Sequence, residues 1–337
     1  MRAASPRLPG RTGSDPGPDL SVTIAGVLFR NPVIAASGTF GYGREYAGLL
    51  DIARLGGICT KGLTLHPRPG NGGRRLHETP AGLMNSIGLE NPGIPAFIEH
   101  ELPALRGLGP VVIANLSGST VEEYAEGAAL LNHAAIDMIE LNISCPNVRA
   151  GGMAFGLEAE AAALVTGRVR RAAPDKPLMV KLSPNAPDLA AVARACVKAG
   201  ADALSLVNTF KAMAIDTCLR RPVFDNISAG LSGPAVRPIA LRLVWELWED
   251  LRAPSSPMPV PIVGMGGIAG ARDALEFLLA GAAAVQVGSA TFANPCAMTE
   301  IIDGIASYMA ERRFKRCEEL TIREPGPADC RAVRTES

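Results

Sequence analysis

The chain has 337 residues, and its 33 Lys and Arg balance its 33 Asp and Glu, so the formal net charge is zero. A neutral chain offers no bulk attraction to nucleic acid or to an anionic membrane, and we expect neither as a partner. Hydrophobic residues make up 47% of the sequence and charged residues 20%. This composition excludes a globally disordered protein and allows a sizeable core.

The seven cysteines are odd in number, and no two lie within four residues of each other. The sequence therefore offers no local zinc knuckle or iron–sulfur motif, and a disulfide framework is not expected in a chain of this length. Residues 1–20 lack the apolar stretch of a secretory signal, and no apolar run reaches the roughly 18 residues of a membrane span. We expect free thiols, no membrane segment and a cytoplasmic location.

Eight short apolar runs recur along the chain, and each is followed by a longer segment. The runs cover residues 32–36, 57–60, 110–115, 136–142, 177–182, 203–207, 260–264 and 283–287. They are rich in Val, Ile, Leu and Ala without strict alternation, which is typical of parallel strands covered on both faces. We expect each run to form a strand.

Helical spacing predicts helices over residues 120–132, 157–171, 187–199, 234–251, 271–280 and 295–312. Thr120 and Glu123 have the spacing of an N-terminal capping box, and Gly200 and Gly281 stand where C-terminal caps are expected. Eight strand–helix units favour an α/β fold of the (β/α)8 TIM barrel type over an open doubly wound sheet. We expect an N-terminal β-hairpin over residues 22–29 to close the bottom of the barrel.

These elements predict a disordered leader over residues 1–20, a single barrel over residues 21–316 and a polar C-terminal tail over residues 317–337. Three connections, residues 62–91, 143–156 and 209–233, are unusually long, and each follows a predicted strand. In a barrel they lie on the C-terminal face, where active sites are built. We expect these long loops to line the active site.

The densest polar cluster, Asn142-Ile143-Ser144-Cys145-Pro146-Asn147, directly follows the fourth predicted strand. A lone cysteine is more often a small buried apolar residue than a reactive group. Here, polar residues surround it at the carboxyl end of a strand, which favours a reactive group. Cys145 is therefore a candidate nucleophile or general base, and it needs activation because an unperturbed thiol has a pKa of about 8.5.

Asparagines also stand at other strand ends or loop starts: Asn85, Asn115, and Asn208 with Thr209 beside it. Each alone is more often a turn residue than a ligand contact. Several at one barrel mouth favour a planar substrate with alternating donors and acceptors, since an amide side chain supplies both. A pyrimidine or a flavin ring has that pattern.

Two lysines stand at strand ends. Lys61 follows the second predicted strand, where a solvated position and a place in the site are equally open, and Lys181 interrupts the apolar fifth strand. A lysine inside a buried strand is costly unless it pairs with an anion or faces a cofactor. A cation beside N1 and O2 of a flavin would stabilise the reduced anionic ring.

Residues 264–269 read Gly-Met-Gly-Gly-Ile-Ala and formally satisfy the G-x-G-x-x-A dinucleotide pattern. The match is weak evidence for NAD, because an acidic residue should follow about 20 positions later, whereas residues 284–288 read Ala-Val-Gln-Val-Gly. Together with Gly288 and Ser289, the run better fits the phosphate site that barrels build after strands seven and eight, which suits FMN. The four histidines show no metal-ligand spacing, and we expect no metal.

Seven motifs, taken together and in order, resemble the dihydroorotate dehydrogenases over residues 22–312. They are Ala36-Ser37-Gly38-Thr39, Thr60-Lys61-Gly62, Asn85-Ser86-Ile87-Gly88-Leu89-Glu90-Asn91-Pro92-Gly93, Asn142-Ile143-Ser144-Cys145-Pro146-Asn147, Val180-Lys181-Leu182-Ser183-Pro184-Asn185, Leu231-Ser232-Gly233 and Gly264-Met265-Gly266-Gly267. The resemblance implies a TIM barrel that binds FMN and oxidises (S)-dihydroorotate to orotate in pyrimidine biosynthesis.

A cysteine rather than a serine at position 145 resembles class 1 of this family, and residues 38–46 and 213–216 look like the class 1B catalytic subunit. Class 1B implies a homodimeric catalytic core and a separate electron-transfer subunit. That subunit would carry FAD and a [2Fe-2S] cluster and would pass electrons to NAD.

Carried over by motif, Cys145 would be the base that removes the C5 proton of dihydroorotate while the C6 hydride passes to N5 of FMN. The implied substrate-binding residues are Lys61, Asn85, Ser86, Ile87, Gly88, Leu89, Asn142, Asn147, Asn208 and Thr209. The implied FMN-binding residues are Ser37, Lys61, Gly62, Asn115, Asn142, Lys181, Val207, Gly233, Gly266, Gly267, Gly288 and Ser289.

Two alternatives stay open at this point. Another FMN barrel that acts on a free pyrimidine, such as a dihydropyrimidine dehydrogenase, is disfavoured by Asn147 and by the motif at residues 85–89. A barrel isomerase or synthase without a redox cofactor would use the loops after strands seven and eight for a phosphorylated substrate.

Overall fold

A computed structural model describes residues 17–144, 155–254 and 259–322. Eight strands form a closed barrel in the order β10-β15-β16-β3-β4-β7-β8-β9, and every neighbouring pair is parallel. They are β3 (Val33–Ala35), β4 (Gly57–Cys59), β7 (Val111–Leu116), β8 (Met138–Asn142), β9 (Leu178–Lys181), β10 (Ala203–Leu206), β15 (Ile262–Met265) and β16 (Ala284–Val287). Each lies in one of the eight apolar runs or overlaps it, so the barrel expectation is confirmed.

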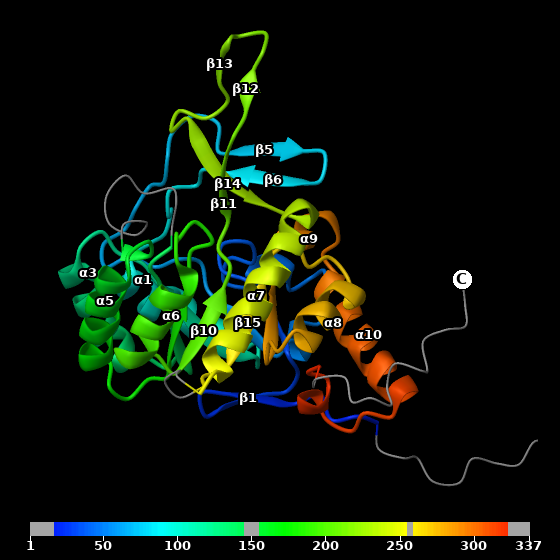
Figure 1. The fold of residues 1–337 in the computed structure, drawn as a ribbon. Coiled ribbons are helices and arrows are strands. Elements are labelled where there is room, and N and C mark those ends of the chain that lie inside the picture. Colours follow the sequence, from blue (N-terminus) through cyan, green and yellow to red (C-terminus); the bar gives the residue numbers. More distant parts are fainter. Residues whose placement is uncertain (1–16, 145–154, 255–258, 323–337) are drawn as a thin grey trace, which may run out of the picture.

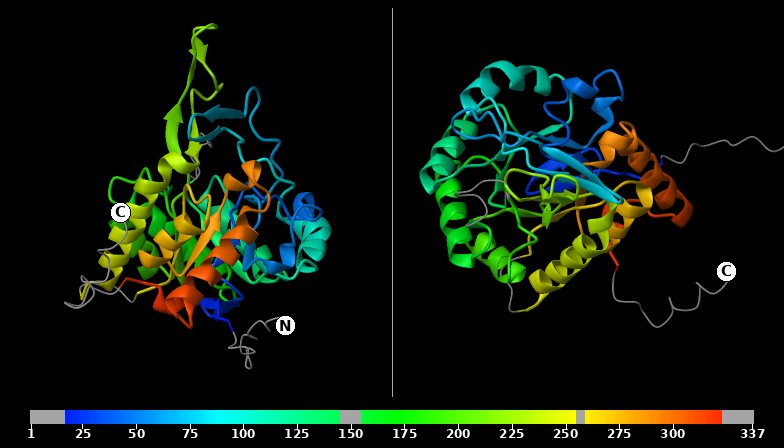
Figure 2. Two further views of the ribbon diagram at one scale, coloured as in Figure 1. Left: turned by 90° about the vertical axis from the view of Figure 1, so that its right-hand side faces the viewer. Right: turned by 90° about the horizontal axis from the view of Figure 1, so that it is seen from above.

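Helices surround the barrel, as Figure 2 shows from above. The six expected helices are α3 (Val121–Asn132), α5 (Ala159–Ala172), α6 (Leu189–Lys198), α7 (Arg237–Arg252), α8 (Ala271–Leu279) and α10 (Ala297–Arg312). Shorter turns fill the remaining connections: η1 (Arg44–Tyr46), η2 (Ile52–Arg54), α1 (Ile94–Ala96), η3 (Phe97–Glu101), α2 (Leu102–Arg106), η4 (Pro234–Val236) and α9 (Ala290–Ala293).

Local capping explains where several helices begin and end. The Thr120 hydroxyl accepts the backbone N–H of Glu123 at 3.1 Å, which satisfies one free donor at the start of α3. The Glu123 carboxylate accepts the N–H of Ser119, one residue earlier than a reciprocal capping box requires. Gly200 follows α6 with φ of 108°, a backbone conformation that favours glycine and ends the helix.

The expected hairpin over residues 22–29 is present as β1 (Val22–Ile24) and β2 (Val27–Phe29), which pair antiparallel at the barrel end opposite the long loops (Figure 1). Ile24 and Phe29 are fully buried there. A Cβ placed on Gly57 would lie 2.9 Å from the Phe29 ring, so this aromatic ring packs directly against the start of β4. The hairpin therefore closes the barrel bottom with apolar side chains.

Two of the long connections build a second, smaller sheet over the C-terminal face. Its strands are β11 (Phe210–Met213), β14 (Ser228–Ser232), β6 (Gly82–Asn85) and β5 (Leu76–Thr79), in that order and antiparallel. A two-stranded ribbon, β12 (Ile215–Asp216) and β13 (Arg221–Pro222), extends farther from the barrel (Figure 1). Met84, Phe224 and Ala229 form a small core of their own in this region. The sheet covers the site that the barrel strands leave open.

The folded body extends past the boundary expected at residue 316. A 3-10 turn, η5 (Cys317–Glu319), follows, and both Cys317 and Leu320 are buried in the main core. The N–H of Ile322 donates to the carbonyl of Leu279 at 2.9 Å. At the other end, the N–H of Asp19 donates to the carbonyl of Lys315. Two apolar side chains among charged neighbours hold residues 317–322 to the barrel, and the rest of the expected leader and tail lies outside the described residues.

Within the described part of the chain, none of the helices is long and apolar enough to cross a membrane.

Candidate active site

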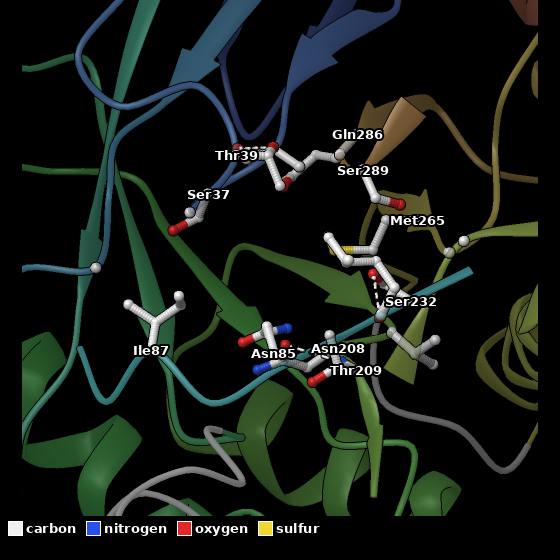
Figure 3. A pocket seen from close by; sticks show the side chains of 18 of the residues that line it. Ser37, Thr39, Asn85, Ile87, Asn208, Thr209, Ser232, Met265, Gln286 and Ser289 are labelled. Atoms are coloured by element: carbon white, nitrogen blue, oxygen red, sulfur yellow. Dashed lines mark hydrogen bonds between the residues drawn. The ribbon is translucent and has the colours of Figure 1, made fainter. Parts of the chain in front are cut away.

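A cavity of about 270 Å³ opens where the barrel strands end, beneath the small sheet. Its wall comes from the carboxyl ends of β3, β4, β8, β9, β10, β15 and β16 and from the loops that follow them. Figure 3 shows Asn85, Asn208 and Thr209 grouped on one side of the cavity, with Thr39 and Ser289 on the opposite side. The cavity is therefore assembled from segments far apart in the sequence.

Most residues proposed from the sequence lie on this one wall. They are Ser37, Lys61, Gly62, Asn85, Ile87, Gly88, Leu89, Asn142, Lys181, Val207, Asn208, Thr209, Gly233, Gly266, Gly267, Gly288 and Ser289. The barrel accounts for this convergence, because the carboxyl ends of all its parallel strands open on the same face.

Two of the proposed residues that the structure describes, Ser86 and Asn115, are not on the wall. The Ser86 side chain is buried and accepts hydrogen bonds from the amides of Asn71 and Asn226, so it holds the loop rather than facing the cavity. Asn115 is fully buried below the cavity and donates to Glu140. Cys145 and Asn147 lie outside the described residues.

Two buried polar residues of this region were missed from the sequence: Glu140 on β8 and Gln286 on β16. Glu140 is completely buried inside the barrel, and Gln286 is 1% exposed and lines the cavity. A charged or amide side chain within an apolar strand is costly unless it has partners. This cost is the signal that the sequence offers for Glu140 and Gln286, as it does for Lys181.

Glu140 is the centre of a network of hydrogen bonds under the cavity. Its carboxylate accepts from the amide of Asn115 at 2.5 Å, the hydroxyl of Ser205 at 2.8 Å and the amide of Gln286 at 2.6 Å. The Cys59 thiol lies 3.1 Å from Oε2, and burial raises the pKa of that thiol well above its ordinary value, so it remains a donor. These contacts come from four different barrel strands.

The charge of Glu140 is balanced by Lys181. The Lys181 Nζ lies 3.8 Å from Glu140 Oε2, and the lysine is 5% exposed and reaches the cavity wall. Burial by itself would raise the pKa of Glu140, but the Lys181 ammonium and the hydrogen-bond donors outweigh burial and hold that pKa below its ordinary value. The cavity floor therefore carries a buried ion pair.

A second lysine stands nearer the rim. Lys61 lies 3.9 Å from Glu90 Oε2, and 28% of its side chain is exposed. Glu90 accepts a closer hydrogen bond from Arg75 at 2.6 Å, and this bond, followed by the charge of Lys61, lowers the pKa of Glu90. Lys61 is therefore a cation on the wall, where it can meet an anionic group of a ligand.

Glycine loops after β15 and before α7 approach each other closely at the cavity. A Cβ on Gly267 would lie 2.7 Å from the carbonyl oxygen of Gly233, and the φ angles of these two residues are 75° and 100°. Only glycine adopts such angles freely and permits this approach. Bare backbone of this kind can meet a phosphate through N–H groups.

Among the described residues, no three His, Cys, Asp or Glu side chains gather closely enough to hold a metal ion. The polar groups at the cavity are instead amides, hydroxyls and two ammonium groups. Such a set recognises a planar heterocycle and an anion rather than a cation.

Comparison with known proteins agrees with this geometry. A family model described as dihydroorotate dehydrogenase matches residues 19–309. The chain is 56% identical over 302 residues to a protein of Petrotoga mobilis named dihydroorotate dehydrogenase B (NAD(+)), catalytic subunit. That match covers 90% of this chain and 98% of the relative.

Proteins with the same name in Geotalea daltonii and Caldicellulosiruptor saccharolyticus are 53% and 50% identical. Each match covers 90% of this chain and 97% or 98% of the relative. Similarity of this extent, together with the family match over most of the sequence, leads to one conclusion: the chain belongs to the dihydroorotate dehydrogenase family.

Proposed function

We propose that this chain is the catalytic subunit of an NAD-linked dihydroorotate dehydrogenase that oxidises (S)-dihydroorotate to orotate in de novo pyrimidine biosynthesis. The observation that carries the proposal is the single cavity whose wall brings together Lys61, Asn142, Lys181 and Asn208 from four strand ends. The names of the relatives give the same activity for those proteins.

The cavity fits FMN as the cofactor. Gln286 Oε1 is buried and has no hydrogen-bond partner among the described residues, although its amide nitrogen is fixed by Glu140. An acceptor held in this way at a cavity wall suits an N–H of a heterocyclic ring. Lys181 supplies a cation on the same wall, and the loops at Gly233 and Gly267 supply backbone for a phosphate.

Bound FMN would accept the hydride that leaves C6 of dihydroorotate. The chain itself has to orient the substrate and take up the C5 proton, so that a C5–C6 double bond forms. Asn85, Asn142, Asn208 and Thr209 present amide and hydroxyl groups that match the donors and acceptors of a pyrimidine. Lys61 supplies a cation for the orotate carboxylate.

The base in this proposal is Cys145, which directly follows Ser144 in the sequence. Ser144 is fully buried, and its hydroxyl lies 3.0 Å from Asn142 Oδ1, so the chain leading to position 145 is anchored at the cavity. The thiolate form removes the C5 proton, and a thiol pKa near 8.5 implies that activity rises as the solution becomes moderately alkaline.

Electron transfer to NAD is assigned to a partner. The relatives are named as catalytic subunits that work with NAD(+), and the seven dispersed cysteines of this chain offer no local iron–sulfur motif. We assign FAD and a [2Fe-2S] cluster to a separate subunit that joins a homodimer of this chain in the cytoplasm.

The alternative of a barrel without a redox cofactor is contradicted by the family assignment. A dihydropyrimidine dehydrogenase is disfavoured by Lys61, because a free pyrimidine has no carboxylate for that ammonium to bind. Purifying the chain and measuring bound flavin and orotate formation from dihydroorotate tests the proposal. We expect about one FMN per chain and orotate as product, and a colourless protein that cannot be reconstituted with FMN would contradict it.

A further inference from the structure

We propose that Glu140 is a positioning residue that fixes Lys181 at the cavity floor and sets the net charge that the floor presents to a bound flavin. The proposal rests on the function proposed above, because it concerns the same cavity. Glu140 itself is absent from the cavity wall and is fully buried, so any effect on a ligand must pass through its neighbours or its charge.

The contacts of Glu140 show how it organises the floor. Oε1 accepts hydrogen bonds from the hydroxyl of Ser205 and the amide of Gln286. Oε2 accepts hydrogen bonds from the amide of Asn115 and the thiol of Cys59. Four neutral donors from four strands hold the carboxylate in one position. Its location is therefore fixed by the barrel and not by any ligand.

Two groups on the cavity wall depend on this fixed carboxylate. Gln286 donates its amide nitrogen to Glu140, which fixes which end of the amide is left for the cavity. Lys181 is drawn to the same carboxylate but stays 3.8 Å away, beyond direct hydrogen-bond range, while it also lines the cavity. The ammonium is therefore held by charge while its N–H groups stay available to a ligand.

The pair gives the floor a formal charge of zero, because one anion offsets one cation. A flavin gains negative charge when it is reduced to the anionic form, and the Lys181 ammonium then lies near two anions instead of one. When Glu140 is neutralised, no anion offsets the Lys181 ammonium, and its attraction for the anionic reduced flavin is stronger. Removing Lys181 leaves Glu140 as an uncompensated anion that opposes reduction.

A residue with a merely structural role makes a different prediction. If Glu140 only connects the strands, neutralising it lowers the stability of the protein and weakens the binding of oxidised and reduced flavin equally. The ratio of the two affinities separates these cases, since uniform damage to the cavity cancels in the ratio. That ratio also requires no turnover, because it follows from the midpoint potential of the bound flavin.

The experiment compares the wild-type chain with Glu140→Gln, Lys181→Met and the double variant Glu140→Gln/Lys181→Met. Each protein is reconstituted with FMN, and its midpoint potential is measured against a dye of known potential. The control is Glu246→Gln, the same chemical change at an exposed glutamate whose ion pair with Arg242 lies on the surface of α7.

We expect Glu140→Gln to raise the affinity for reduced FMN relative to oxidised FMN by tenfold or more. A tenfold change corresponds to a rise of about 30 mV in the midpoint potential of a two-electron couple. Lys181→Met shifts the ratio the other way by a similar factor, the double variant lies between the single variants, and Glu246→Gln matches the wild type. Should Glu140→Gln fail to fold, the double variant, which buries no unpaired charge, is compared with Lys181→Met and must have the higher potential.

A potential unchanged by Glu140→Gln, or equal potentials in Lys181→Met and the double variant, overturns the proposal while leaving the proposed function intact. A wild-type chain that binds no flavin in either redox state contradicts the proposed function and this inference with it. These two failures are therefore distinguishable in one set of samples.

Discussion

The amide nitrogen of Asn208 lies 2.9 Å from the hydroxyl oxygen of Ser144, and this hydrogen bond joins the loop after β10 to the loop after β8. Ser144 in turn donates to Asn142 Oδ1 at 3.0 Å, and the Asn142 amide donates to Asn115 at 3.3 Å. A continuous line of hydrogen bonds thus runs from the rim of the cavity to the residues around Glu140. It fixes the segment that leads to Cys145.

Replacing Asn208 by alanine tests this line. Asn208→Ala removes an amide from the cavity wall and takes away one hydrogen-bond donor to Ser144. Leaving a buried polar group without its partner costs about 1–3 kcal/mol of free energy. We expect kcat/KM for dihydroorotate to fall roughly 10- to 100-fold. Asn294→Ala is the control, since Asn294 is a half-buried asparagine that donates to Glu300 and does not line the cavity. If Asn208→Ala and Asn294→Ala have equal kcat/KM values, Asn208 has no role in binding or orienting the substrate.

Cys145 provides the sharpest test of the proposed base. Cys145→Ala should retain FMN and lose turnover by about 10²- to 10⁴-fold, the range for removal of a general base. Cys145→Ser should be weak or intermediate, because a hydroxyl is a poorer base without a proton relay. Cys218→Ala, at an exposed cysteine, should match the wild type. Flavin reduction by dihydroorotate at the wild-type rate in Cys145→Ala would exclude this assignment.

The buried thiol of Cys196 predicts a loss of stability in alkali. Burial raises its pKa to about 12, above the value of about 8.5 for an unfolded thiol. Its stabilising contribution is therefore complete below pH 8.5 and is lost as the pH rises from there toward 12. Each thiol of this kind makes the free energy of unfolding fall more steeply with pH, by about 1.4 kcal/mol per pH unit.

Cys196→Ala should flatten the fall in unfolding free energy between pH 9 and pH 10.5 by that amount, whatever its effect on stability at pH 7. Denaturant unfolding at several pH values measures the slope. Cys218→Ala, whose thiol is exposed, should leave the slope unchanged. Parallel curves for Cys196→Ala and wild type would show that the thiol does not titrate as its burial requires.

The isolated chain should reduce NAD slowly even when it is loaded with FMN and supplied with dihydroorotate. The reason is the absence from the sequence of a local iron–sulfur motif and of a convincing dinucleotide fingerprint. Co-purification from native extract, with measurement of iron, sulfide, FAD and FMN, tests the two-subunit arrangement. Rapid NAD reduction by the pure chain would refute it.

The barrel was predictable because its signal is local. Continuous apolar runs mark strands buried on both faces, and helical spacing marks the segments between them. The small sheet was not predictable in the same way. Its strands β5 and β6 are short and partly exposed. Asn85 stands opposite Leu76 on one side but opposite Gly230, far along the chain, on the other. Such pairing is set by tertiary structure rather than by any local pattern.

The site shows the same division. Residues at strand ends, such as Lys61 and Asn208, could be placed because a barrel brings all strand ends to one face. Glu140 could not be interpreted, because its five partners stand on five other strands and only the closed barrel brings them together. The Ser86 side chain does not line the cavity although its neighbours do, because a motif gives a residue's position but not the direction of its side chain.

The central claim is that this chain oxidises dihydroorotate with its own bound flavin, and anaerobic titration of the FMN-loaded chain tests it most directly. Adding (S)-dihydroorotate in the absence of any partner or acceptor should bleach the flavin absorbance, with about one orotate formed for each flavin reduced. A flavin that stays oxidised in excess dihydroorotate, in a protein that dithionite still reduces, would contradict the account.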